Sequence, residues 1–253
     1  MPRINKLDIV ALDLVNLDST RTFASHVLQT YSQQINVLLL CAAAVYGHHS
    51  VDESGNEKTL QTNVLSQALL IQCLWPRLTD PKLLNGMSPR IVFVGSSLHK
   101  GAAQEHRVSP SNLDNLLATT PWKPKQAYAL SKLVQMHVYQ ITNDAFSKIK
   151  GATTLPIVVA VCPGFVPQTG LIREYSWWIR GLMTYVMPLM PFTTSVEKAG
   201  ETIMRAMKDQ NLASGDCISP RGDDSLAPEC MDLVLRSAWR DWLISKGAWA
   251  EGL

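Results

Sequence analysis

A chain of 253 residues, of which 46% are hydrophobic, is long enough to bury the core of one large domain. Charged residues make up only 17%, below the usual share of about 25%, which argues against a disordered or coiled-coil chain. The formal net charge of +2 comes without a block of basic residues and argues against nucleic-acid binding.

Predicted strands and helices alternate through the first third of the chain. Residues 7–14 have the pattern of a strand, and residues 19–33 have the apolar spacing of a helix. Residues 35–42 form a continuous apolar run of strand length, as in a strand that is buried on both faces. Residues 59–78 then have a long helical pattern, which we expect to end near Pro76.

The same alternation continues to the end of the chain. The further elements are a strand at 90–96, a polar excursion at 98–121, a helix at 125–148, a strand at 156–162, a helix at 196–208, a short strand at 217–218 and a helix at 228–245. Such alternation predicts an α/β fold with a doubly wound, parallel, Rossmann-like sheet. No internal repeat, linker or low-complexity segment occurs, so we expect a single domain over residues 1–253.

Three predicted strand ends are the places to look for a ligand site, because open parallel sheets bind ligands at the carboxyl ends of their strands. These ends hold Cys41–Ala44, Ser96–Ser97 and Pro163–Gly164. The sequence therefore predicts that these three segments line one crevice.

Tyr128 and Lys132 lie four residues apart near the start of the helix predicted at 125–148, and this spacing puts them on one face. A free tyrosine has a pKa near ~10 and is a poor base at neutral pH, but a nearby ammonium group lowers that pKa. The pair therefore suits acid/base catalysis. Ser97 follows a predicted strand, where a hydroxyl is suited to hydrogen-bond a carbonyl or alkoxide oxygen.

A Tyr-x-x-x-Lys pair alone is a weak signal, because a surface tyrosine stacked on a lysine stem has the same spacing. The order of buried strand, Ser-Ser, Tyr-x-x-x-Lys helix, buried strand and Pro-Gly is more specific, and it resembles the short-chain dehydrogenase/reductase family. The stretches that resemble the family's signatures are Leu12–Leu14 with Ser19, Asn36–Ala43, Asn63–Ser66, Ile91–Ser97 and Pro163–Leu171. The wide gap between Ser97 and Tyr128 and the run Thr169–Glu174 resemble the retinol-dehydrogenase-like and protochlorophyllide-reductase-like branches.

The resemblance implies a role for each matching residue. Tyr128 would exchange the substrate proton, and Lys132 would lower its pKa and hold the nicotinamide ribose. Ser97, in preference to Ser96, would position the substrate oxygen, and Asn63 would anchor a water relay behind Lys132. The expected contacts with the cofactor, NADP(H) or else NAD(H), come from Asp13 near the adenine, Ala42, Ala43, Tyr128, Lys132, Pro163, Gly164 and Thr169.

The chain departs from this family at its beginning. The family opens with a strand, a Thr-Gly-x-x-x-Gly-x-Gly turn that holds the pyrophosphate, a helix and a second strand, and no such glycine pattern occurs in the sequence. We therefore expect a domain that is shortened at the N-terminus, with the first strand–helix–strand unit absent. Residues 7–14 then belong to an incomplete gene model, or pair directly with residues 36–42, or are loosely held.

A second departure concerns the strand at 35–42. Its end reads Leu40-Cys41-Ala42-Ala43 where the family has Asn-Asn-Ala-Gly. The family's asparagines tie neighbouring strands together, and its glycine lets the cofactor approach closely. Ala43 is small enough to serve, but Leu40 and Cys41 cannot replace the amide hydrogen bonds.

Residues 177–192 are rich in Trp, Met, Leu and Tyr around the single charge of Arg180. In the family this region is a substrate lid, so its apolar character implies a small-molecule substrate that is bulky and apolar. Contact with a membrane surface or with a second copy of the chain is an alternative, since an exposed apolar patch needs a partner. Packing against its own domain is the simplest reading.

The remaining features point to a location rather than to a reaction. The five cysteines form no CxxC pair and are expected to be buried free thiols of a reducing compartment. The histidines at 48, 49, 99 and 106 are expected in loops without a carboxylate at metal spacing, so no metal site is predicted. No apolar run suits a signal peptide or a spanning helix, so we expect a cytoplasmic protein that is membrane-associated at most through residues 177–192.

Two functions follow from these patterns. The first is an NAD(P)-dependent carbonyl reductase or alcohol dehydrogenase for a bulky apolar substrate, in secondary-metabolite biosynthesis by analogy, which acts as a monomer or as a homo-oligomer through the Tyr128 helix. The second is a relative without hydride transfer: a pseudoenzyme, a regulator or a redox-neutral enzyme. The absent glycine turn supports the second function, and the retained Tyr128 and Lys132 support the first.

Overall fold

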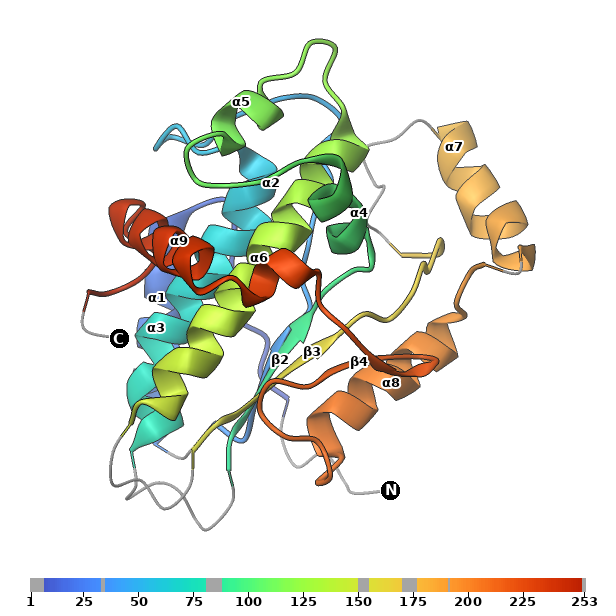
Figure 1. Cartoon of the computed structure of the whole chain (residues 1–253). Helices are drawn as coiled ribbons and strands as arrows, with labels where there is room; N and C mark the ends of the chain where they lie inside the picture. Colours follow the sequence, from blue (N-terminus) through green and yellow to red (C-terminus); the bar gives the residue numbers. More distant parts are fainter. Residues whose placement is uncertain are drawn as a thin grey trace.

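The computed structural model describes residues 7–32, 35–80, 88–149, 155–169, 177–190 and 192–251. It forms one layered α/β body, with a short helical segment standing away from it (Figure 1). The predicted fold class is thereby confirmed.

A five-stranded sheet in the order β1-β2-β3-β4-β5 forms the middle layer. Its strands are β1 (Val37–Leu40), β2 (Arg90–Val94), β3 (Ile157–Val161), β4 (Cys217–Ser219) and β5 (Gly222–Asp224). The first four pair in parallel, and β5 pairs antiparallel to β4. The sequence did not reveal β5, because a three-residue Gly-Asp-Asp strand has neither alternation nor β-propensity.

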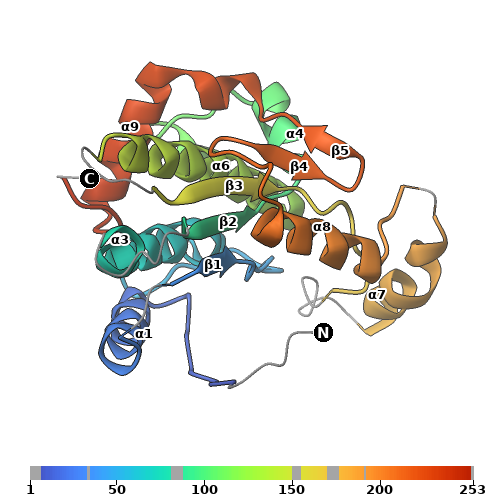
Figure 2. The same ribbon diagram turned by 90° about the horizontal axis from the view of Figure 1, so that it is seen from below.

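Helices cover both faces of this sheet (Figure 2). The α-helices are α1 (Leu17–Thr30), α2 (Lys58–Leu60), α3 (Ser66–Thr79), α4 (Leu98–Glu105), α5 (Leu113–Leu117), α6 (Pro124–Ser147), α7 (Trp177–Gly181), α8 (Val196–Lys208) and α9 (Leu233–Ser245). The π-helical segments are η1 (Gln61–Leu65) and η3 (Leu182–Val186), and the 3₁₀ segments are η4 (Met187–Leu189) and η5 (Pro228–Met231). Helices α3 and α6 lie on one face, with α1 packed on α3 and with α4 and α9 packed on α6, whereas α8 packs on the other face. No described helix is both long and apolar enough to cross a membrane.

The core follows from the two-residue period of the strands. Ile91 and Phe93 of β2 belong to the large apolar cluster beneath α3 and α6. Val92 and Val94, the alternate residues of the same strand, belong to the smaller cluster against α8. Because both faces of β2 are buried, residues 91–94 form a continuous apolar run, and this run made the strand predictable.

The prediction of a strand at residues 7–14 was wrong. Leu7 is 76% exposed and Ile9 is 91% exposed, and the segment is irregular chain outside the sheet. A strand needs a neighbour with which to pair, and β1 pairs with β2 alone among the described residues. The end of the segment is held by the Leu14 carbonyl, which accepts a hydrogen bond of 2.7 Å from Ser66 Oγ on α3.

Two further expectations about helices need correction. Helix α3 does not end near Pro76 but continues to Thr79. Pro76 lies in the last turn of α3, where it lacks only the N–H that would donate to the carbonyl four residues earlier. The polar excursion at 98–121 contains two helices, α4 and α5, and α4 places His99 in the interior instead of in a loop.

One buried histidine has no hydrogen-bond partner among the described residues. His137 lies on α6, and its ring stacks on Trp239 of α9 with the ring centroids 5.5 Å apart. Neither ring nitrogen meets a hydrogen-bonding group of the described chain. Burial, and secondly the charge of Arg236, lower the pKa of His137 to about 3.

We expect acid to destabilise the fold through His137. The unfolded chain protonates this histidine near pH 6.5 but the folded chain only near pH 3, so stability is complete above the first value and falls as pH is lowered between them. At pH 5 the expected loss is about 2 kcal/mol. A His137→Phe variant keeps the stack on Trp239 and should lack this loss, as measured by urea unfolding at pH 7 and pH 5. Equal acid losses in both proteins would contradict the argument.

Candidate active site

The carboxyl ends of β1, β2 and β3 lie side by side because these strands are parallel neighbours. Ala42 is exposed and Ala43 half-buried after β1, Ser96 is half-buried after β2, and Gly164 is exposed after β3. Helices α4 and α6 approach the same end of the sheet (Figure 1). The three segments expected to line one crevice are therefore brought together.

Tyr128 and Lys132 face this end of the sheet from α6. The helix begins with Pro124 at its first position, and Tyr128 follows one turn later. Tyr128 is 9% exposed and Lys132 is 2% exposed, so both are nearly buried. Lys132 Nζ lies 5.6 Å from the centroid of the Tyr128 ring, within the range of a cation–π contact.

Burial sets the protonation states of this pair. It raises the pKa of Tyr128 above the usual value, while a hydrogen bond with the Ser96 side chain opposes that shift. It also lowers the pKa of Lys132 to about 8. At neutral pH, Tyr128 therefore carries its proton and Lys132 is mostly charged, and this arrangement can deliver a proton and stabilise the phenolate that remains.

A chain of hydrogen bonds fixes the position of the Lys132 ammonium group. Nζ donates to the Val94 carbonyl at 2.8 Å and to Gln135 Oε1 at 3.0 Å. Gln135 Nε2 donates to Gln67 Oε1 at 2.6 Å, and Gln67 Nε2 donates to the Ala42 carbonyl at 2.8 Å. Amide groups do not release protons at neutral pH, so this chain positions the lysine and does not conduct protons.

The sequence interpretation missed Gln67 and Gln135. Gln135 comes three residues after Lys132, and Gln67 comes four residues after Asn63, so each shares a helix face with a residue that was singled out. Both glutamines could have been found as polar residues that lie one helical turn from a candidate site residue in an otherwise apolar helix.

The two serines lie in different surroundings. Ser96 is half-buried, and its side chain opposes the rise in the pKa of Tyr128. Ser97 is exposed at the N-terminal cap of α4. The role of Ser97 in holding the substrate oxygen stays a prediction, with Ser96 as the alternative that lies nearer to Tyr128.

Asn63 lies in the π-helical segment η1 and ties the segment after β1 to α6. Its Oδ1 accepts from the Ala44 N–H at 2.8 Å, and its Nδ2 donates to the Ala44 carbonyl and to Ser131 Oγ, both at 3.0 Å. None of the recorded side-chain bonds of Asn63 reaches Lys132. The Asn63 side chain therefore has a structural role, since it holds Ala44 next to Ser131. The expected water relay stays a prediction.

Replacing Asn63 with leucine should destabilise the fold by about 2 kcal/mol or more, since two buried backbone groups of Ala44 lose their partner. Urea unfolding measures the change. Asn115→Leu is the matched control, because Asn115 is exposed on α5 and the same substitution there should stay within about 0.5 kcal/mol. Equal effects at the two positions would show that the Ala44 contacts contribute nothing.

The Pro163–Gly164 loop needs its glycine. Gly164 has φ +86°, and a Cβ at this position would collide with Thr194 Oγ1. The loop is held by the Thr194 N–H, which donates to the Phe165 carbonyl at 2.8 Å. Thr169 is exposed and its hydroxyl turns back to the Val166 carbonyl at 3.1 Å. Residues 170–174 of the branch motif lie outside the described residues.

The residues present fit one half of a nicotinamide dinucleotide. An ammonium group has three donors, and within the described part of the chain Lys132 Nζ uses two of them, on Val94 and Gln135, so that one can serve a ligand oxygen beside Tyr128. On the adenine side, Asp13 is exposed and its carboxylate accepts from the Val15 N–H, within its own turn. The described residues contain no glycine-rich turn that would receive a pyrophosphate.

Known proteins resemble this chain over most of its length. The model of the NAD dependent epimerase/dehydratase family matches residues 2–160. A short chain dehydrogenase of Arthrobotrys oligospora is 28% identical over 198 residues, covering 75% of this chain and 57% of that protein. The short-chain dehydrogenase/reductase tropG of Talaromyces stipitatus is 32% identical over 184 residues, covering 71% of this chain and 54% of that protein. The chain thus spans about half the length of the curated relatives it matches.

Solved structures resemble it in fold. NADPH-bound carbonyl reductase from chicken fatty liver aligns with a TM-score of 0.56 at 16% identity, covering 87% of this chain and 77% of that one. The RhlG/NADP active-site complex of Pseudomonas aeruginosa aligns with a TM-score of 0.54 at 20% identity, covering 83% and 73%. At such identities the likeness concerns the Rossmann-like fold alone.

Proposed function

The chain belongs to the short-chain dehydrogenase/reductase family, and on that premise we propose that it is an NAD(P)-dependent oxidoreductase acting on a carbonyl or alcohol group. One observation carries the proposal: Tyr128, Lys132 and Ser96 converge at the carboxyl end of β2. The same three groups, with these protonation states, are what proton transfer to a carbonyl oxygen requires.

The nicotinamide supplies or accepts the hydride when it is bound. Tyr128 holds its proton in a buried position and donates it to the substrate oxygen. Ser96 orients that oxygen, and the Lys132 ammonium stabilises the phenolate left on Tyr128. Because burial keeps Tyr128 protonated, the site suits reduction of a carbonyl better than oxidation of an alcohol. We propose NADP(H) as the cofactor, because two solved structures of similar fold contain NADPH or NADP, with NAD(H) as the alternative.

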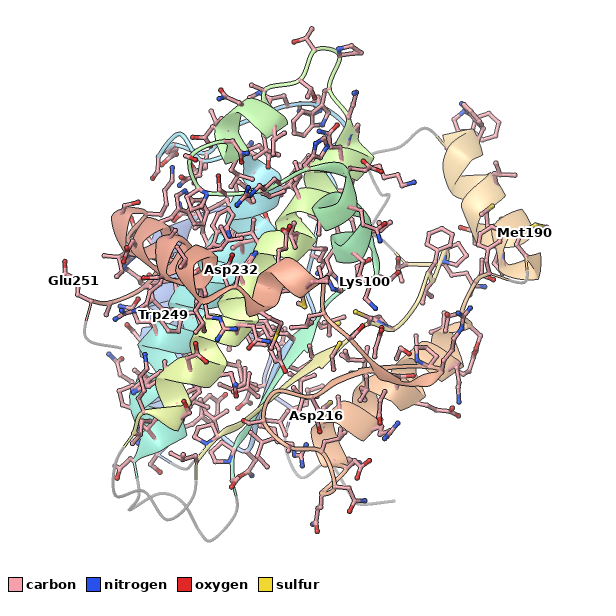
Figure 3. The ribbon with its side chains drawn as sticks, viewed as in Figure 1. Lys100, Met190, Asp216, Asp232, Trp249 and Glu251 are labelled. Carbon is pink, nitrogen blue, oxygen red and sulfur yellow. The ribbon has the colours of Figure 1, made fainter. Side chains whose placement is uncertain are left out.

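The exposed apolar segment after the Pro163–Gly164 loop supports a bulky apolar substrate. Trp177 is 83% exposed and Tyr185 is 79% exposed, and the segment with Met190 stands away from the sheet (Figure 3). Phe192, at its end, stacks on Phe165 of the loop with ring centroids 6.4 Å apart. This contact links the segment to the site, so we propose that it closes over the substrate, which we assign by analogy to secondary metabolism. The competing explanation is that this exposed apolar segment contacts a membrane surface or a second copy of the chain.

A relative without hydride transfer is the second candidate. The end of β1 favours it, because Leu40-Cys41-Ala42-Ala43 stands where the family has Asn-Asn-Ala-Gly, and Leu40 and Cys41 cannot make the amide hydrogen bonds.

Calorimetric titration with NADPH, and then with NADH, separates the two candidates. We expect micromolar binding of NADPH, and weaker binding by a Lys132→Met variant, which lacks the free ammonium donor. Lys125→Met, an exposed change on the same helix, is the matched control. A folded chain that binds neither dinucleotide would overturn the proposal.

The two serines give a further prediction for the same activity. Ser96→Ala should lower kcat at least ~10-fold, because it removes a hydroxyl that bonds Tyr128 and orients the substrate oxygen. Ser97→Ala, one residue further and exposed, should leave kcat unchanged. Steady-state reduction of a bulky apolar ketone with NADPH measures both variants, and the opposite order would restore the sequence-based preference for Ser97.

A further inference from the structure

Three potential metal ligands meet near the carboxyl end of β3. They are Cys162, directly after β3, Cys217 at the start of β4, and Asp224 at the end of β5. One ligand atom of each lies within 4.8 Å of the others. Cys162 is 2% exposed and Cys217 is 6% exposed, so both sulfurs are shielded from solvent.

The register of the sheet explains why they meet. Cys217 pairs with Ala160 of β3 on one side and with Asp224 of β5 on the other. Cys162 follows Ala160 by two residues and therefore points to the same face. All three side chains thus project from one face of the sheet, although 62 residues separate the first from the last in sequence.

His99 of α4 lies beside this cluster but is not one of its ligands. Its Nδ1 lies 2.6 Å from the Ser96 carbonyl, and its Nε2 accepts from the Ala227 N–H at 3.2 Å, so both ring nitrogens are engaged elsewhere. Two sulfurs and one carboxylate oxygen leave the fourth position of a tetrahedral cation to a water molecule.

A disulfide is a poor alternative for the two cysteines. They lie diagonally on neighbouring parallel strands, and strand spacings of about 4.8 Å and about 3.3 Å per residue put their Cα atoms about 8 Å apart. A disulfide needs Cα atoms within about 7 Å. Two sulfurs bound to one Zn²⁺ at about 2.3 Å in tetrahedral geometry lie about 3.8 Å apart, which this arrangement permits.

We propose that Cys162, Cys217 and Asp224 form a site for a thiophilic divalent cation, of which Zn²⁺ is the best match. Binding breaks the two S–H bonds, releases two protons to solvent and forms two zinc–thiolate bonds, with no change of oxidation state. Lys100, which is labelled in Figure 3, forms an ion pair of 2.6 Å with Asp224. It is one-third exposed and turns outward when the cation takes its place.

The site differs from the sequence expectation, which found no metal ligands at local spacing. Its three residues come from the end of β3, from β4 and from β5, so no short motif contains them. A cation held there would join the β4–β5 hairpin to the end of β3, and we therefore expect the bound metal to raise the melting temperature.

Titration of the reduced, metal-free chain with Co²⁺ tests the site. We expect one Co²⁺ per chain, thiolate-to-cobalt charge-transfer absorption in the near ultraviolet, and loss of these bands when Zn²⁺ is added. Calorimetry with Zn²⁺ in two buffers of different ionisation enthalpy should report the release of two protons. The bands should disappear in Cys162→Ser and in Cys217→Ser, and Asp224→Asn should weaken binding at least tenfold.

Cys230→Ser is the matched control, because Cys230 is an equally buried free thiol on η5. The charge-transfer bands of Co²⁺-loaded Cys230→Ser should equal those of the unchanged chain. Circular dichroism checks the fold of every variant. If a serine variant fails to fold, protection of Cys162 and Cys217 from alkylation by added Zn²⁺ in the unchanged chain decides the question. Absence of charge-transfer bands, absence of protection, or bands that persist when both cysteines are replaced would overturn the proposal.

Discussion

A Tyr128→Phe variant is expected to lose about 10³-fold or more in kcat while binding NADPH as well as the unchanged chain does. The substitution removes only the hydroxyl, and with it the proton donor that burial holds in its protonated form. A positioned acid typically contributes ~10²–10⁴ to a rate. Phenylalanine keeps the ring beneath the Lys132 ammonium, so the cation–π contact and the packing of α6 stay in place.

Tyr139→Phe is the control for this experiment. Tyr139 lies on the same helix and is fully buried, but its hydroxyl donates to the Asp216 carbonyl, away from the crevice. Removing that hydroxyl should affect stability and leave kcat unchanged. If Tyr128→Phe keeps its activity, proton transfer does not pass through Tyr128. The redox-neutral or regulatory function would then be the better description of the molecule.

The parts of the fold that could be predicted are those with a local signal. Residues 91–94 of β2 and all of β3 are continuous apolar runs because both faces of each strand are buried, and α8 follows the helical period closely. Residues 7–14 have a similar apolar pattern, but a strand forms only by pairing, and the pattern does not reveal whether a neighbour exists. The exposed coil at Ile9 is the result.

The candidate site shows the same limit. The spacing of Tyr128 and Lys132 on one helix was enough to place them together. The choice between Ser96 and Ser97 depends on the residue at which the chain turns into α4, which no local pattern fixes. The meeting of Cys162, Cys217 and Asp224 depends on the register of three strands, and register is a property of the folded sheet.

The second large effect is a pH dependence of stability that arises from Lys132. The unfolded chain keeps the lysine proton up to about pH 10.5, whereas the folded chain releases it near pH 8 because burial penalises the charge. Between these values the unfolded state binds more protons, so the free energy of unfolding rises with pH. The total rise attributable to Lys132 is about 3 kcal/mol.

Urea unfolding of the unchanged chain and of Lys132→Met from pH 7 to pH 10 isolates this contribution, because all other groups titrate alike in the two proteins. The difference between the two free energies should be constant below pH 8 and should then change in favour of the unchanged chain by about 1.4 kcal/mol per pH unit. Lys125→Met, which removes an exposed lysine from the same helix, should show no such slope. A difference for Lys132→Met that stays flat to pH 10 would mean that the buried ammonium keeps its proton. Val94 and Gln135 would then stabilise the charge more than burial opposes it, and Lys132 would hold a charged group beside Tyr128 across the whole working range.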